Sequence, residues 1–287
     1  MANPPNLRLR LSNRPENVVV VRQAIIGLAE AVELDPLVLS HVSTAVSEAC
    51  NNVVLHAYGG ERGPLEVDVA GPSPLRVSVR DYGGGLPDDA ERPVGANEVG
   101  GIGLPMIQAL SQHVRFGPGE QRENGGPCGT EVEMEFDTEQ TTSHLEPPHD
   151  SPEPTPRGAD VEEVLVSIAP TEIAGPILHR VLSALAARAQ FSTERIFDTQ
   201  LVADAVVAAT DRSGVLGRVE LSVHVGDRVL ELNVGPLSRG EGDALLTNAT
   251  VDGVGSILDR LADGPVVSPL EGMEMLKLRL GATRPAQ

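Results

Sequence analysis

Apolar residues recur along this chain with two periods, which predict an order of strands and helices. Residues 7–11 alternate leucine with arginine, a period of two that indicates an edge strand. Between residues 15 and 33 the apolar positions are three or four apart, as on one face of an amphipathic helix. Asp35-Pro36 then supplies an N-cap followed by proline in the first turn, so a second helix is expected to begin there.

The same pattern continues through the first 137 residues. Paired strands are expected at 64–69 and 75–81, and a polar loop containing glycine and proline follows the second of them. A further helix is expected after this loop, with an apolar face made of Ile107, Leu110 and Val114. A last strand is expected from Thr130 to Phe136.

Residues 138–160 are rich in proline, acidic residues, serine and threonine, and they lack apolar periodicity. Because such a composition cannot bury a core, this segment is expected to be a linker between domains at 1–137 and 161–287. The second domain repeats the order of predicted elements in the first, including a glycine pair, Gly253 and Gly255, before its last helix. A tandem duplication explains this repetition most economically.

Composition and charge exclude several classes of function. At 287 residues, 40% of them hydrophobic and 2% aromatic, the chain can build two aliphatic cores but no platform of aromatic side chains for stacking bases. The net charge of −19 argues against binding nucleic acid or an anionic membrane, and it favours basic protein partners or simply solubility. With neither a signal peptide nor an apolar run of about 18 residues, a cytoplasmic location is expected. The cysteines, Cys50 and Cys128, show no metal-ligand spacing.

The second predicted helix carries the first candidate chemistry. Glu48, Asn52 and His56 are four residues apart, so a regular helix would place them on one stripe. Glu48 could act as general base toward a hydroxyl group or a water. The amide oxygen of Asn52 is a suitable hard ligand for Mg²⁺.

A second candidate segment, Asp81-x-Gly83-x-Gly85, ends a predicted strand. An ionised aspartate only accepts hydrogen bonds, so Asp81 could bind the exocyclic amino group of adenine. Taken alone, aspartate before glycine is commonly part of a turn. The segment therefore gains meaning only beside other elements of a nucleotide site.

A third candidate segment, Gly101-x-Gly103-Leu104, opens the helix after the polar loop. Glycines allow close approach of the backbone, and the free N–H groups of a helix N-terminus bind phosphates. A phosphate loop of the Gly-x-x-x-x-Gly-Lys-Ser/Thr type does not occur in the sequence.

In order and spacing, these three segments resemble the N, G1 and G2 boxes of the GHKL (Bergerat-fold) ATPases, and Gly129-Thr130 resembles their last, weaker box. The run from Ser47 to Tyr58 resembles that of the RsbW-type anti-sigma-factor serine kinases, and the likeness covers residues 6–137. It implies an α+β fold, a two-layer α/β sandwich. Its mostly antiparallel, mixed sheet would have helices on one face and would be duplicated in tandem.

The resemblance also implies roles for single residues. Glu48 would be the catalytic base, Asn52 would bind Mg²⁺ and Asp81 would hold adenine. The remaining residues expected to bind ATP are Gly83, Gly85, Gly101, Gly103, Leu104, Gly129 and Thr130.

The family phosphorylates a serine of a STAS-domain anti-anti-sigma protein and alternatively sequesters a sigma factor, so the resemblance implies bacterial transcription regulation by partner switching. Because the boxes specify nucleotide binding better than the phosphate acceptor, a non-catalytic, ATP-dependent protein-binding switch is the alternative.

The second domain departs from this pattern. Aligning the predicted helices puts Asp204 opposite Glu48 and Ala208 opposite Asn52, and residues 233–237 stand where the Asp81 segment stands. Without a magnesium ligand and an adenine carboxylate, the second domain is expected to be a pseudo-ATPase. It could mimic the second subunit of a family that often dimerises, giving an intramolecular pseudo-dimer, or it could be a docking surface; a homodimer also remains open.

Overall fold

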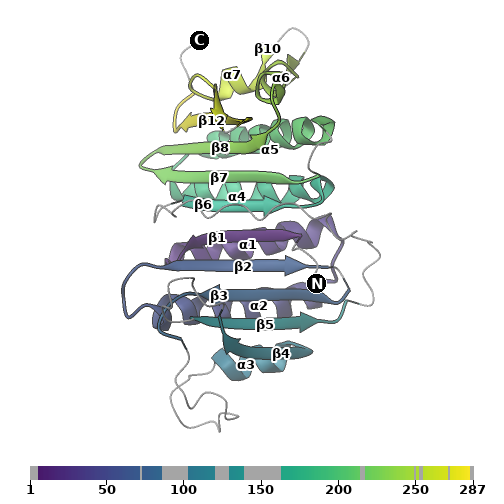
Figure 1. The fold of residues 1–287 in the computed structure, drawn as a ribbon, viewed down its shortest axis with the longest axis vertical. Coiled ribbons are helices and arrows are strands. Elements are labelled where there is room, and N and C mark those ends of the chain that lie inside the picture. The colour runs from purple at the N-terminus through teal and green to yellow at the C-terminus, as the bar shows by residue number, and fades with distance from the viewer. Residues whose placement is uncertain are drawn as a thin grey trace.

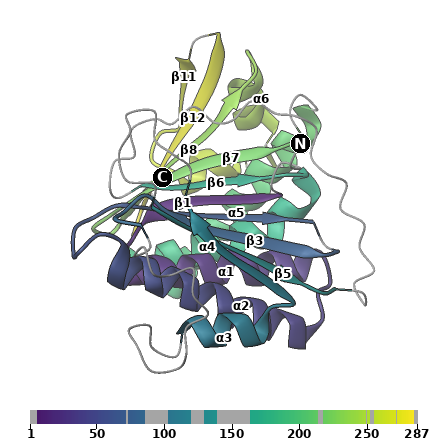
Figure 2. The same ribbon diagram turned by 60° about the horizontal axis from the view of Figure 1, so that its bottom comes forward.

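The computed structural model describes residues 6–71, 73–85, 103–119, 129–138, 163–213, 217–248, 250–251, 255–270 and 272–284. These residues form two layers, with a sheet on one side and helices covering one of its faces (Figures 1 and 2). The main sheet has ten described strands in the order β11-β12-β8-β7-β6-β1-β2-β3-β5-β4. Every pairing found in it is antiparallel, so the expected α+β class is confirmed while the described part of the sheet contains no parallel pair.

The first half of the chain contributes five strands and three helices among the described residues. In order they are β1 (Leu7–Ser12), α1 (Pro15–Ala31), α2 (Pro36–Asn52), the π-helical turn η1 (Val53–Ala57), β2 (Pro64–Ala70), β3 (Leu75–Asp81), α3 (Gly103–Leu110), β4 (His113–Pro118) and β5 (Thr130–Phe136).

The second half continues the same sheet. Its described elements are β6 (Glu163–Ile168), η2 (Thr171–Ile173), α4 (Ala174–Arg188), α5 (Thr193–Ser213), β7 (Val219–Gly226), β8 (Val229–Leu237), α6 (Glu241–Asn248), β9 (Thr250–Val251), β10 (Gly255–Ser256), α7 (Ile257–Leu261), β11 (Val266–Leu270) and β12 (Met273–Gly281).

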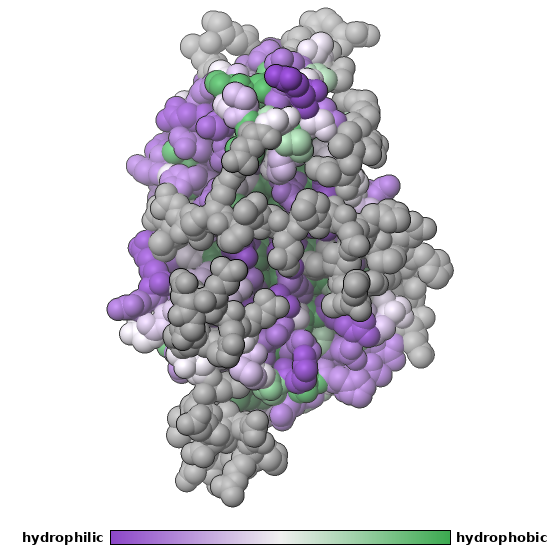
Figure 3. All heavy atoms as spheres, viewed as in Figure 1, coloured by the Kyte–Doolittle hydropathy of each residue, from purple (hydrophilic) through white to green (hydrophobic). Residues whose placement is uncertain are grey.

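Alternation along the strands separates the core from the open face of the sheet. The leucines of β1 are buried beneath the helices, while Arg8 forms an ion pair with Asp68 of β2. Hydrophilic side chains dominate the coloured part of the face in Figure 3. At the start of α2, the predicted N-cap is confirmed, because Asp35 Oδ1 accepts hydrogen bonds from the N–H groups of Leu37 and Val38 at 2.8 and 3.3 Å.

Two predictions about helices are wrong. Val114 does not extend the apolar face of α3, because the helix ends at Leu110 and Val114 lies in β4, opposite Met134 of β5. The helical spacing of apolar positions, three and then four residues, therefore continued by coincidence into a short strand. His56 does not continue a regular stripe, because the backbone changes to a π-helical turn at Val53 and His56 is exposed.

The two halves meet at a seam inside one continuous sheet. Strand β1 pairs antiparallel with β6, and Leu9 lies opposite Val166 at this seam. Because β1 also pairs with β2, the prediction of an edge strand at residues 7–11 is wrong. Behind it α1 packs on α4 so closely that a Cβ at Gly27 would lie 2.6 Å from the Cα of Ile177. Two arginines of α4 also reach α1, where Arg180 pairs with Glu30. The halves therefore form one structural unit.

The strand registers of the halves match. Across the first half, one row of side chains runs through Leu9, Val67 and Val79. Across the second half, the corresponding row runs through Val166, Leu221 and Val234. Since Leu9 and Val166 hold the same place in their rows and face each other, the halves are related by an approximate twofold axis at the seam.

Candidate functional site

The end of α2 and the start of α3 meet at Glu48, Asn52 and Gly103. The side chains of Glu48 and Asn52, which both lie on α2, are partly buried. A Cβ at Gly103 would lie 3.1 Å from Glu48 Oε2 and 3.5 Å from Asn52 Oδ1. The absence of a side chain at Gly103 thus leaves a carboxylate and an amide oxygen beside the N-terminus of α3.

Asp81 closes β3 with a buried carboxylate, only 4% exposed. Its Oδ1 accepts a hydrogen bond from the N–H of Gly83 at 2.8 Å, and Thr130 hydrogen-bonds it through both its backbone and its side chain. Burial raises the pKa of Asp81 above its ordinary value, while these hydrogen bonds act in the opposite direction. The carboxylate is thereby fixed in orientation at the end of the strand.

Glycines hold the backbone around Asp81 in close contact. A Cβ at Gly83 would lie 1.9 Å from the carbonyl oxygen of Ala57 in η1, and a Cβ at Gly129 would lie 2.0 Å from that of Asp81. Gly129 and Gly85 also have positive φ angles of 62° and 77°, which favour glycine. Three segments far apart in the sequence converge here because the glycine at each contact has no side chain.

The other residues that the sequence singled out lie on α3, outside the described residues, or in the core. Leu104 lies in the first turn of α3 and packs against the core. Gly101 lies outside the described residues. Cys50 is fully buried on α2, and burial raises its pKa to about 12, so it is a neutral thiol rather than a nucleophile.

Sequence reasoning missed the part that Tyr58 plays in joining these segments. Its hydroxyl group donates a hydrogen bond to the carbonyl oxygen of Pro64 at 2.5 Å and accepts one from the N–H of Tyr82 at 2.8 Å. The tyrosine ends the helix-like run, so the sequence shows a boundary there but not a contact with the strand that bears Asp81.

The oxygen atoms at this site suit Mg²⁺. In the described part of the chain, no group of three or more His, Cys, Asp or Glu residues could hold a metal ion. Mg²⁺ needs no such cage, because it keeps several waters and takes one or two protein oxygens together with phosphates. The amide oxygen of Asn52 beside Gly103 can supply one of these ligands.

Comparison with known proteins agrees with this geometry. Residues 11–136 match the model of the histidine kinase-like ATPase domain. The serine-protein kinase RsbW of Halalkalibacterium halodurans is 30% identical over 135 residues, which are 43% of this chain and 79% of the relative. This chain belongs to the RsbW family.

Two further relatives match a similar share of the chain. The serine-protein kinase RsbW of Oceanobacillus iheyensis is 28% identical over 128 residues, 40% of this chain and 81% of that protein. The anti-sigma F factor of Geobacillus kaustophilus is 29% identical over 118 residues, 38% of this chain and 80% of its own length. An ATPase domain of this family implies the use of ATP. None of the described helices has the length and apolar character to cross a membrane.

The second half lacks the corresponding side chains. Glu33 and Gln190 both have positive φ angles at the turn between paired helices, and burial along α5 repeats that along α2 when these two residues are aligned. This alignment puts Ala205 opposite Glu48. The predicted match of Asp204 with Glu48 is therefore one residue out of register.

The second half also lacks the carboxylate at the end of the strand that corresponds to β3. The register of β8 puts Pro236 where Asp81 stands in β3, so Pro236 replaces the carboxylate. Nearby, the carboxylate of Glu274 accepts hydrogen bonds from the N–H groups of Gly240 and Gly242 at 2.9 and 3.0 Å. These two backbone donors are thus bound by a carboxylate of the chain itself.

Proposed function

We propose that the chain is an ATP-dependent serine kinase of the anti-sigma type, with one working ATP site in its first half. The observation that carries the proposal is that Glu48 and Asn52 of α2 lie beside Gly103 of α3. The end of the same helical run, at Ala57, contacts Gly83 in the loop after Asp81. Its substrate would be a serine of a STAS-domain anti-anti-sigma protein. In the alternative state it would sequester a sigma factor.

Each residue of the site has a proposed task. Asp81, fixed by Gly83 and Thr130, accepts a hydrogen bond from the amino group of adenine. Asn52 holds Mg²⁺ through its amide oxygen. Glu48 takes the proton of the attacking serine hydroxyl as general base. Bound Mg–ATP would supply the terminal phosphoryl group, which would pass to the serine oxygen with release of ADP, and Mg²⁺ would supply the charge neutralisation that this transfer needs.

We further propose that the second half is a degenerate copy of the first, a pseudo-ATPase that replaces the partner of a dimer. Matched strand registers and the approximate twofold seam between β1 and β6 support the duplication. Ala205 and Pro236 in place of Glu48 and Asp81 support the loss of the ATP site. The chain would then be an intramolecular pseudo-dimer.

Calorimetric titration of Mg–ATP into the full-length protein, beside an Asn52→Ala variant, tests this proposal. We expect one site per chain and its strong weakening in the variant, because the variant loses the proposed oxygen ligand of Mg²⁺. Two sites in the wild type would contradict a silent second half. Absence of binding in the wild type would contradict the ATP site itself.

A non-catalytic, ATP-dependent switch that binds a partner protein is the second candidate. It would share the ATP site and the titration result but not the transfer of phosphate. Transfer from radiolabelled ATP to a purified STAS-domain protein separates the two, because only the kinase leaves label on the acceptor serine.

A further inference from the structure

The hydroxyl group of Tyr58 joins the end of the α2–η1 helix to Tyr82, the first residue after Asp81. The register of β2 and β3 pairs Leu65 with Asp81 as its last rung. Continued by one residue, it would set Pro64 opposite Tyr82. Instead of a direct backbone pairing between Pro64 and Tyr82, the hydroxyl group of Tyr58 bridges the carbonyl oxygen of Pro64 and the N–H of Tyr82.

The ring of Tyr58 packs against Gly63 at a distance that leaves no room for a side chain there. A Cβ at Gly63 would lie 2.1 Å from Cε1 of Tyr58, so the ring rests directly on the backbone there. Gly63 is held in turn by Asn13, whose side-chain oxygen accepts its N–H at 2.9 Å and whose own N–H donates to its carbonyl oxygen at 2.9 Å. The hydroxyl group is therefore placed by packing and hydrogen bonds that begin at the end of β1.

The π-helical turn makes a second contact with the loop after Asp81, beside the hydrogen bond of Tyr58. The carbonyl oxygen of Ala57 accepts a hydrogen bond from the N–H of Gly84 at 3.0 Å and touches Gly83. Residues 57 and 58 thus accept hydrogen bonds from the N–H groups of Gly84 and Tyr82, just after Asp81. A π-helical turn contains more residues than an α-helical one, and such turns are frequent at functional sites because they re-aim the groups that follow.

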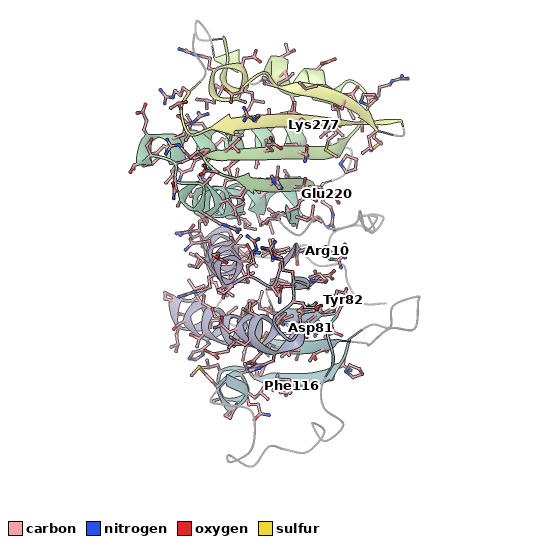
Figure 4. All side chains as sticks on the ribbon, turned by 90° about the vertical axis from the view of Figure 1, so that its left-hand side faces the viewer. Arg10, Asp81, Tyr82, Phe116, Glu220 and Lys277 are labelled. Carbon is pink, nitrogen blue, oxygen red and sulfur yellow. The ribbon has the colours of Figure 1, made fainter. Side chains whose placement is uncertain are left out.

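We infer that Tyr58 is a positioning residue for the nucleobase, since its hydroxyl group fixes the point at which β3 leaves β2 and thereby the carboxylate of Asp81. This role rests on the ATP site proposed above. It concerns selection of the base rather than phosphoryl transfer. The neighbouring Tyr82 contributes only its backbone N–H to the bridge. Its own side chain lies on the other side of the strand, toward Arg10 and Glu66 (Figure 4).

The two tyrosines provide a matched test in the full-length protein. Tyr58→Phe keeps the ring on Gly63 but leaves the carbonyl oxygen of Pro64 and the N–H of Tyr82 without their bridge. We expect Mg–ATP to bind about tenfold more weakly and the preference for ATP over GTP to narrow. Tyr82→Phe removes a hydroxyl group one residue from Asp81 and should change neither quantity. Calorimetric titration with both nucleotides measures them, and thermal unfolding checks that each variant is folded.

A second variant reaches the same ring by another route. Gly63→Ala keeps the hydroxyl group of Tyr58, but its methyl group displaces the tyrosine ring from the backbone of residue 63. It should therefore also narrow the preference for ATP over GTP. If Tyr58→Phe and Gly63→Ala are folded and retain the wild-type affinity and preference, Tyr58 has no positioning role although the ATP site stands. If the wild type itself binds no ATP, the proposed function fails, and the role of Tyr58 fails with it.

Discussion

The two halves of the sheet share their strand registers but differ in the side chains at the ends of the matching elements. Where the first half has Glu48 on its second helix and Asp81 at the end of its third strand, the second half has Ala205 and Pro236. Both halves bury corresponding rows of aliphatic side chains, so they agree in the buried part of the sheet and differ at the ends of the matching elements. The fold therefore requires the rows, and only the proposed chemistry requires the ends.

The largest expected effect comes from giving the first half the residue of the second. Glu48→Ala should lower phosphate transfer to a STAS-domain protein about 10³-fold, the range of a lost general base, and leave Mg–ATP binding nearly unchanged. Asp204→Ala is the control, because Asp204 is exposed in the second half, where it pairs with His179. Radiolabel transfer measures the effect, and full transfer by Glu48→Ala would rule out this residue as the base.

A smaller effect is expected at the seam where the halves join. Gly27→Ala places a methyl group 2.6 Å from Ile177 Cα, so α1 and α4 must move apart, at a cost of about 1–3 kcal/mol in the free energy of unfolding. Gly175→Ala in α4 is the matched control, because a Cβ there meets nothing within 4 Å. Its helix propensity should leave stability unchanged or raise it slightly. Equal denaturant midpoints for the two variants would show that the helices are not in close contact.

The smallest effect concerns pH. The pKa of Asp81 is raised in the folded state from 3.8, so the folded protein holds this proton more tightly than the unfolded chain. The contribution of Asp81 to the free energy of unfolding is therefore fully present below pH 3.8 and is lost as pH rises through the raised pKa.

Asp81→Asn should remove this dependence, because the amide does not titrate. Urea unfolding of the wild type and the variant at a series of pH values in this window measures the difference. A difference between the two proteins that stays constant with pH would show that the pKa of Asp81 is not raised by folding.

The sequence predicted most elements and most of the candidate site, for identifiable reasons. Alternation in β1 and β3 and the N-cap at Asp35 act over a few residues, so they can be recognised locally. The seam between β1 and β6 could not be predicted, because backbone groups make it and any exposed strand edge can pair. The contact of Tyr58 with Tyr82 could not be predicted either, because it joins residues 24 positions apart that meet only in the folded state.

Because β1 and β6 belong to the same chain, the seam obeys intramolecular rather than bimolecular equilibrium. Its population does not depend on protein concentration, whereas subunits of a two-chain dimer separate on dilution. It also cannot exchange one half for that of another molecule without breaking a continuous ten-stranded sheet. The pairing of one half with the other is therefore decided when the chain folds and not by how much of the protein is present.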